Sequence, residues 1–389
     1  MMPSKKISVF ILLSFLLAVE SHFKFLIKTI LAGNPYGPDF VYYLNSASLY
    51  LKGAPYSSIL NFHSLGYYIL FIPFTVFSSR DASIAWLVMG YALLFVSIWL
   101  ILKIYRDKPS AQDWLILMFL VFSFKPINDQ VYWNQSNFLL LFLLSASLFL
   151  LKNRKMVWAG ILLGLCISVR EYFAVLILLF LWRREWRYLL GVMLGLIFLK
   201  AAGIIVFHWT NEVLYWQGIT TFISSTSIMF SNFSLSAAIH RLGNDSNGES
   251  LVCFVISLLV RVFFIVWALY LTKKRHAVLK DSIVLEFCLF LILAFLITPW
   301  VTESHFVALF PAILIAWMHL EKKENILNYC FFVLAYVLLG LGNTLGFPAF
   351  ALGPVSIFNT GIIWGLIILF ILTGRMLGPD SAAESKTNK

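Results

Sequence analysis

The chain has 389 residues, of which 61% are hydrophobic and only 12% are charged, and its mean hydropathy is +0.88. This composition, which includes 37 phenylalanines, excludes a soluble globular protein. Apolar runs of roughly 17–25 residues recur from end to end, and each is long enough to cross the hydrocarbon core of a bilayer. The period-two alternation typical of a membrane β-barrel is absent from the sequence. We therefore expect an all-α polytopic membrane protein.

The formal net charge of +11 is compatible with a nucleic-acid partner, but the positions of the basic residues argue against one. About 20 of the 29 lysines and arginines fall in one alternating set of short loops and in the two termini. An excess of basic residues marks the cytoplasmic loops of membrane proteins, so this charge sets orientation. The set comprises Lys5, Lys6, Lys103, Arg106, Lys108, Lys152, Arg154, Lys155, Arg183, Arg184, Arg187, Lys273, Lys274, Arg275, Lys280, Lys322, Lys323, Arg375, Lys386 and Lys389.

The apolar runs predict about twelve membrane-spanning helices with both ends of the chain in the cytoplasm. A further run at 63–79 contains Pro73, and a full crossing there would break this parity, so we expect a re-entrant or half-depth segment. The first run lacks a small-residue cleavage site and is expected to remain as an uncleaved helix. Residues 1–375 form one predicted domain, followed by a disordered cytoplasmic tail at 376–389. The predicted spans are 7–31, 82–103, 111–126, 134–151, 156–169, 171–182, 188–207, 250–272, 282–299, 305–320, 326–345 and 354–374.

A polar stretch from Gly33 to Ser58 interrupts the apolar pattern after the first predicted span. Asp39 lies in it, directly after a turn rich in proline and glycine, and the spacing of the apolar residues that follow predicts a short amphipathic helix at the outer membrane surface. A carboxylate at this boundary is partly desolvated, which favours a general base. The same carboxylate can instead cap the N-terminus of the helix.

Arg170 and Glu171 divide two short apolar runs. An arginine at membrane depth usually pairs with an acid or binds an anion. Glu171 is the nearest acid in the sequence, but adjacent residues on a helix do not face each other. Lys200 and Arg261 lie within predicted spans, where they either line an interior cavity or extend toward the membrane surface.

Two later segments carry polar groups on the same expected side of the membrane as Asp39. Asn232 and Ser234 can hydrogen-bond a sugar or cap the helix that begins there. Glu303 and His305 stand at the mouth of the next apolar run, where the histidine can donate to a phosphate or act as an interfacial cap. The four cysteines lie singly in apolar runs without the spacing of a metal site, so we expect small core residues.

The order of these motifs resembles glycosyltransferase family 87, in the GT-C class of membrane glycosyltransferases. Asp39 is followed by a pattern of tyrosine, alanine and glycine that is similar to this family, and further matches extend over residues 36–320. Asn134 is a departure, because the family usually has glycine there. The matching residues are Tyr43, Ala47, Tyr50, Gly53, Tyr56, Gln135, Ser136, Asn137, Ala159, Gly160, Gly164, Arg170, Asn232, Phe233, Ser234, Leu235, Arg241, Thr298, Pro299 and His305.

The resemblance implies a GT-C-type fold and an inverting transfer of a hexose, mannose in this family, from a polyprenyl-phosphate sugar to a hydroxyl group. It implies a reaction on the non-cytoplasmic face of a bacterial inner membrane, facing the periplasm or exterior. The implied partners are a lipid-linked sugar donor and a glycan or glycolipid acceptor, and the resemblance implies no cofactor and no metal.

The resemblance also implies roles for individual residues. Asp39 is expected to deprotonate the acceptor, and His305, Arg170 and Arg261 to bind the donor phosphate. A transporter or flippase for lipid-linked glycans is the alternative function, and a non-catalytic scaffold is a third. Neither alternative explains an isolated outward carboxylate on an amphipathic helix, so we favour the enzyme. The residues expected to contact the acceptor or the sugar are Glu303, Gln135, Asn232 and Glu171.

Overall fold

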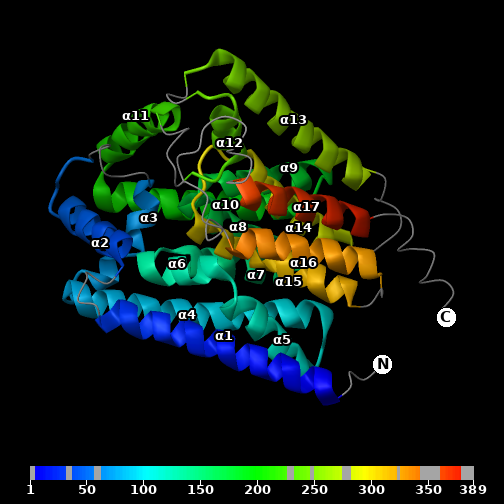
Figure 1. Cartoon of the computed structure of the whole chain (residues 1–389). Coiled ribbons are helices and arrows are strands. Elements are labelled where there is room, and N and C mark those ends of the chain that lie inside the picture. Colours follow the sequence, from blue (N-terminus) through cyan, green and yellow to red (C-terminus); the bar gives the residue numbers. More distant parts are fainter. Residues whose placement is uncertain are drawn as a thin grey trace.

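The computed structural model describes residues 5–31, 37–56, 63–225, 232–245, 249–273, 282–321, 325–341 and 360–377. Within these ranges the regular structure is helical and includes no strand, which confirms the all-α class. Figure 1 shows long helices packed side by side in one bundle. Residues 378–389 of the expected tail lie outside the described residues.

The helices follow one another with short connections. They are α1 (Lys5–Leu31), α2 (Pro38–Leu51), α3 (Leu65–Ile69), η1 (Ile72–Phe74), α4 (Ser79–Tyr105), α5 (Ala111–Phe122), α6 (Lys125–Trp133), α7 (Asn137–Lys152), α8 (Met156–Val169), η2 (Glu171–Ala174), α9 (Val175–Trp182), α10 (Trp186–Phe207), α11 (Trp209–Ser225), α12 (Leu235–Leu242), α13 (Leu251–Lys273), α14 (Ser282–Ile297), η3 (Glu303–Leu309), α15 (Phe310–Leu320), α16 (Ile326–Leu341) and α17 (Gly361–Met376).

Among the described residues, four helical segments are long and apolar enough to cross a membrane, namely α4, α10, α13 and η3 together with α15. Eight shorter apolar helices accompany them, as expected for an integral membrane protein. Within 63–79, α3 and η1 are both too short to cross a bilayer, which agrees with the expected half-depth segment. The expected number of about twelve spans and the GT-C-type fold stay predictions.

Two local expectations were wrong. The stretch 208–249 was expected to be a long outer loop, but it contains the helices α11 and α12. Cys330 was expected in the core, but it is exposed on α16, whereas Cys166, Cys253 and Cys288 are buried. Both errors have one cause, because an apolar run shows where a helix lies but not which of its faces is buried.

The closest helix packing joins α8 to α10. Gly160 and Gly164 on α8 face Gly191 and Gly195 on α10, and a Cβ on any of the four would collide with the backbone of the opposite helix. Small residues four apart let two membrane helices approach until their backbones touch. This contact fixes the end of α8, where Arg170 stands, relative to α10.

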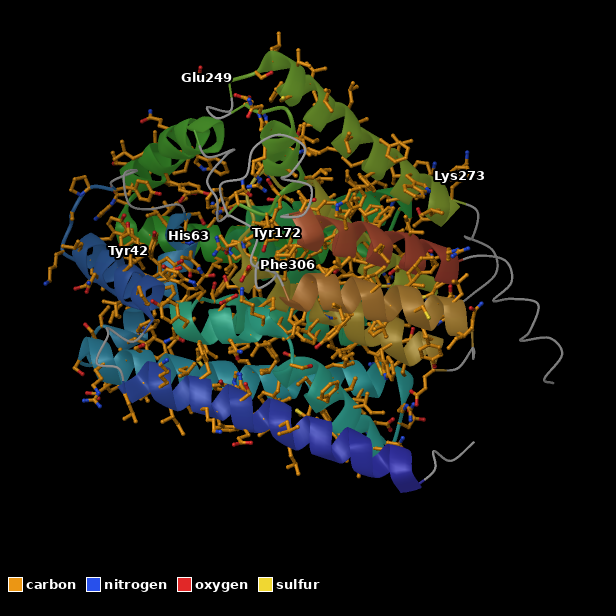
Figure 2. The ribbon with its side chains drawn as sticks, viewed as in Figure 1. Tyr42, His63, Tyr172, Glu249, Lys273 and Phe306 are labelled. Atoms are coloured by element: carbon orange, nitrogen blue, oxygen red, sulfur yellow. The ribbon has the colours of Figure 1, made fainter. Side chains whose placement is uncertain are left out.

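The two ends of the bundle differ in character. Figure 1 shows that α1 begins and α17 ends at one end, whereas α2 and α3 lie toward the other. Near the first end, Arg183 after α9 pairs with the buried Glu286 of α14, with Nε–Oε2 at 2.5 Å and Nη2–Oε1 at 2.7 Å. Figure 2 shows Lys273 at this end as well, and Tyr42 near the opposite one. The expected basic loops therefore lie away from the segment that carries Asp39.

The contact between α8 and α10 generates a stability prediction. Gly164→Ala places a Cβ against the carbonyl oxygen of Val192, so it is expected to push the helices apart and to cost about 1–3 kcal/mol of unfolding free energy. The melting temperature of the protein in detergent measures this loss. Gly361→Ala is the matched control, because its Cβ would lie 3.7 Å from Leu338 Cδ2, an ordinary contact. Equal melting temperatures for the two variants would contradict the prediction.

Candidate active site

Asp39 lies in the first turn of α2 but does not cap it. The N-cap residue is Gly37, which has a left-handed φ of 69°, and no side-chain hydrogen bond closes this end of the helix. The half-buried carboxylate of Asp39 instead accepts a hydrogen bond from Gln135. The capping interpretation of Asp39 is therefore wrong, and the carboxylate is directed at the other helices.

The turn between α6 and α7 holds this end of α2 in place. Asn134 has a left-handed φ of 52°, and its Nδ2 donates to the carbonyl oxygen of Ser83 at 3.0 Å and to Ser83 Oγ at 2.9 Å. A Cβ on Gly37 would collide with the Asn134 side chain, so the two left-handed turns are in contact. Because a left-handed φ suits glycine and is tolerated by asparagine, Asn134 fits the position where the resembling family usually has glycine.

Gln135 is oriented toward Asp39 by a buried hydrogen-bond network. Its Oε1 accepts from Asn137 Nδ2 at 2.9 Å and from Ser304 Oγ at 2.8 Å, and its Nε2 donates to Asp39. Since both donors lie on the oxygen side of the amide, the amide can present only its NH₂ group to the carboxylate. Asn137 is itself fixed by Gln130 Oε1 at 2.8 Å. The network positions Asp39 and links α2 to the segment that carries His305.

The environment of Asp39 favours a general base. Burial raises the pKa of the Asp39 carboxyl above its ordinary value, and the amide of Gln135, the charge of Arg170 and the Tyr43 hydroxyl each limit that rise. A carboxylate that is partly desolvated but still ionised takes a proton more readily than one in water.

Arg170 stands between α8 and η2 as an arginine without a counter-ion. Within the described ranges its guanidinium makes no hydrogen bond or ion pair, and its Nε is buried without a partner. Its charge nevertheless reaches Asp39 and His63, because it lowers the pKa of both. A guanidinium with open donors in a buried setting is suited to bind an anion.

Glu171 does not neutralise Arg170. Its Oε1 accepts from Tyr215 Oη of α11 at 2.8 Å. Nearby, Lys200 of α10 pairs with Glu212 at 2.8 Å and lies over the Tyr215 ring, with Nζ 5.3 Å from the ring centroid. These contacts attach α11 to the outer end of the bundle, and they hold the acids of this region away from Arg170.

His305 begins η3, next to Ser304 of the Gln135 network. Its Nδ1 accepts from the backbone N–H of Thr302 at 3.3 Å, so it does take part in capping this helix. A neutral imidazole that accepts at Nδ1 carries its proton at Nε2, which leaves an N–H to donate elsewhere. The ring is 3% exposed and lies 6.2 Å from the ring of Tyr172, two residues beyond Arg170. The two expected roles of His305, cap and donor, are thus served by different nitrogens.

Glu303 faces α6 rather than Asp39. Its Oε2 lies 2.6 Å from Lys125 Nζ. Asp129, one turn further along α6, is half-buried, and burial together with Glu303 raises its pKa to about 8. The three groups form a mixed-charge cluster beside the Gln135 network, at the position where we expected an acceptor contact.

Two of the expected site residues lie apart from this centre. Asn232 is 0% exposed, its Nδ2 donates to the carbonyl oxygen of Pro299 at 2.9 Å, and its Oδ1 accepts from the backbone of Val301 at 3.2 Å. These bonds tie the start of α12 to the segment before η3, which is a positioning role. Arg261 lies on α13, and no hydrogen bond or ion pair joins it to Asp39 in the described part of the chain.

His63, which the sequence did not single out, belongs to the centre. It precedes α3, is 5% exposed, and its ring lies 5.1 Å from that of Tyr43 and 4.2 Å from that of Tyr67. Burial lowers the pKa of His63 well below its ordinary value, and the charges of Arg170 and His305 add to this effect. Figure 2 shows Tyr42, His63, Tyr172 and Phe306 in one band across the middle of the molecule. Its apolar surroundings in the sequence gave no signal for this position.

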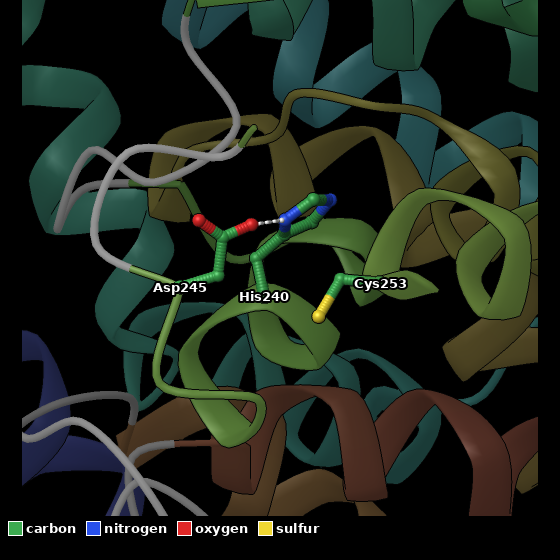
Figure 3. Close-up of side chains that lie close together, drawn as sticks. All are labelled: His240, Asp245 and Cys253. Carbon is green, nitrogen blue, oxygen red and sulfur yellow. Dashed lines mark hydrogen bonds and ion pairs between the residues drawn. The ribbon is translucent and has the colours of Figure 1, made fainter. Parts of the chain in front are cut away.

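A second cluster of titratable side chains lies between α12 and α13. His240 Nδ1 is 2.7 Å from Asp245 Oδ2, and Cys253 Sγ is close to both, as Figure 3 shows. The carboxylate of Asp245 also accepts from the backbone N–H groups of Ser250 at 2.8 Å and Glu249 at 3.3 Å. With these partners Asp245 ties the connection between the two helices, and the expectation that the protein needs no metal stays a prediction.

The Gln135 network generates a prediction about Asp39. Gln135→Leu removes a donor that stabilises the carboxylate, so the pKa of Asp39 is expected to rise, and at any pH near it more of the group is protonated. Infrared titration of the carboxyl band, with an Asp39→Asn variant as the subtraction blank, measures the midpoint. Asn153→Leu, a distant amide after α7, is the control and should leave the midpoint in place. A midpoint that falls in Gln135→Leu would contradict the assigned contact.

The comparisons with known proteins add a family. The family model of glycosyltransferase family 87 matches residues 62–299, more than half of the chain. The matched range includes His63, Gln135 and Arg170, but it begins after Asp39 and ends before His305. Neither a curated protein nor a solved structure matches the chain. With the motifs and the family match in agreement, the chain belongs to glycosyltransferase family 87.

Proposed function

We propose that this glycosyltransferase moves a hexose, mannose by its family resemblance, from a polyprenyl-phosphate sugar to a hydroxyl group with inversion. The observation that carries the proposal is the pairing of a half-buried carboxylate with an arginine that lacks a counter-ion, on two sides of one buried polar centre. A base and an anion site at this separation are what an inverting displacement of a phosphate requires.

Asp39 is the base in this mechanism. The acceptor oxygen attacks the anomeric carbon while its proton passes to the Asp39 carboxylate, and the electron pair of the breaking bond stays on the phosphate oxygen. Gln135 holds the carboxylate in position without supplying a full positive charge, so the carboxylate keeps its basicity.

Arg170 and His305 bind the departing phosphate. The guanidinium of Arg170 offers donors that are not used within the described residues, and His305 offers its Nε2–H. Because negative charge on the phosphate grows as the bond breaks, these donors are expected to bind the transition state more tightly than the ground state. Arg261 and Asn232 are not placed in this step, since their contacts lie elsewhere.

The orientation of the site follows from the charges. The basic loops lie at the end of the bundle away from Asp39, and basic loops face the cytoplasm. We therefore propose that the reaction takes place on the non-cytoplasmic face of a bacterial inner membrane. A lipid-linked donor reaches the site from the membrane, and a glycan or glycolipid acceptor from outside. The transporter alternative gains nothing from the structure, because the family match points to group transfer.

The proposal predicts that Asp39→Asn lowers sugar transfer by about 10²- to 10⁴-fold, the usual contribution of a general base, because the amide cannot take a proton. Transfer of radiolabelled mannose from polyprenyl-phosphate mannose to acceptors in a membrane extract measures this in proteoliposomes. Asp81→Asn, an exposed aspartate in the first turn of α4, is the matched control and is expected to keep full activity.

In the same assay Arg170→Ala is expected to raise the KM for the lipid donor and to lower kcat, because the phosphate contact strengthens in the transition state. Near-full transfer by a folded Asp39→Asn protein would refute the assigned base. A change confined to the acceptor KM in Arg170→Ala would refute the assigned phosphate contact.

A further inference from the structure

The polar centre contains a third nitrogen base that the proposed mechanism does not use. His63 is 5% exposed, and within the described residues it forms no hydrogen bond or ion pair. Burying an imidazole without a hydrogen bond is unfavourable, and a phenylalanine would fill the same space without that cost. A buried histidine of this kind calls for a ligand as its partner.

The position of His63 is fixed by contacts on both sides. The next residue, Ser64, donates from Oγ to the carbonyl oxygen of Ser168 at 3.1 Å, two residues before Arg170. On the other side, the His63 ring packs against Tyr43, which lies one turn after Asp39 and hydrogen-bonds its carboxylate. His63 therefore lies between the end of α8 and the base-bearing helix α2, and it is not a surface residue that swings free.

The groups around His63 carry positive charge and open donors rather than acids. Arg170 and His305 both act on it electrostatically, and among the described residues none of the three pairs with a carboxylate. Tyr172 of η2, whose ring is 6.2 Å from that of His305, has a buried hydroxyl without a partner. Three nitrogen bases and a free phenol from separate elements, held close without a counter-ion, form a cradle for a multiply charged oxyanion.

We propose that His63 is a further donor-binding residue, which hydrogen-bonds the phosphate of the lipid-linked sugar together with Arg170 and His305. The inference rests on the proposed function. The phosphate of the donor is a diester with one negative charge, whereas the released monoester carries up to two. The third donor is therefore of greatest value for the product-like state, in which an additional phosphate oxygen has become charged.

The test measures binding of farnesyl monophosphate, farnesol and inorganic phosphate to the purified full-length protein. Wild-type protein is expected to bind farnesyl monophosphate at least tenfold more tightly than farnesol. His63→Phe keeps the packing against Tyr43 and Tyr67 but removes both nitrogens, and it is expected to weaken binding of farnesyl monophosphate about tenfold or more, with farnesol unchanged. His63→Gln, which retains an N–H donor, should recover part of this loss. His208→Phe, at an exposed histidine, is the control.

Each outcome has a distinct meaning. If Arg170→Ala weakens binding of farnesyl monophosphate but both His63 variants bind like wild type, the inference about His63 is overturned and the proposed function stands. If wild-type protein does not distinguish farnesyl monophosphate from farnesol, the phosphate site of the proposed function falls with it. If inorganic phosphate binds as tightly as farnesyl monophosphate, the cradle takes free phosphate and the lipid assignment is overturned. Where His63→Phe lowers the melting temperature, His63→Gln decides.

Discussion

A positive charge without a counter-ion is the constraint on which the polar centre depends. A buried guanidinium is unfavourable unless paired, and the described part of the chain gives Arg170 no acid. The nearby acids have partners of their own, and Asp39, the acid whose pKa its charge lowers, is bonded to an amide. Binding an anion would supply the missing partner, so the unpaired charge favours the liganded state. The acids with other partners are Glu171 with Tyr215, Glu212 with Lys200, and Glu303 with Lys125.

Close helix packing makes this arrangement rigid. The glycines of α8 and α10 bring two backbones together, and the last residue of α8 leads directly into Arg170. On the opposite side, the left-handed turn at Asn134 holds Gly37, and with it the first turn of α2. Base and cation therefore stand on separate elements, each fixed by backbone geometry. Such fixed groups need little reorganisation when charge develops in the transition state.

The sequence predicted the class of the protein, most of the helices and the central residues Asp39, Arg170 and His305, because charges in apolar runs are rare and stand out. It missed α11, since its polar sequence lacks an apolar run. It also missed His63, because a histidine beside a half-depth segment looks like a boundary residue. The role of Gln135 as an oriented donor, and the closed hydrogen bonds of Asn232, depend on contacts between residues far apart in the chain. No local pattern encodes such contacts.

The separation of Asp39 from Arg170 resolves a conflict within the proposed reaction. An ion pair between them would lower the pKa of the carboxyl by about 1–3 units, and the base would lose strength while the cation lost its place on the phosphate. The Gln135 amide occupies the carboxylate instead, so the charge of Arg170 acts on Asp39 only from a distance. When a phosphate binds Arg170, its negative charge offsets that effect, and the pKa of Asp39 rises. Asp39 therefore becomes a stronger base in the donor complex than in the empty site, which couples proton transfer from the acceptor to the presence of the lipid-linked sugar.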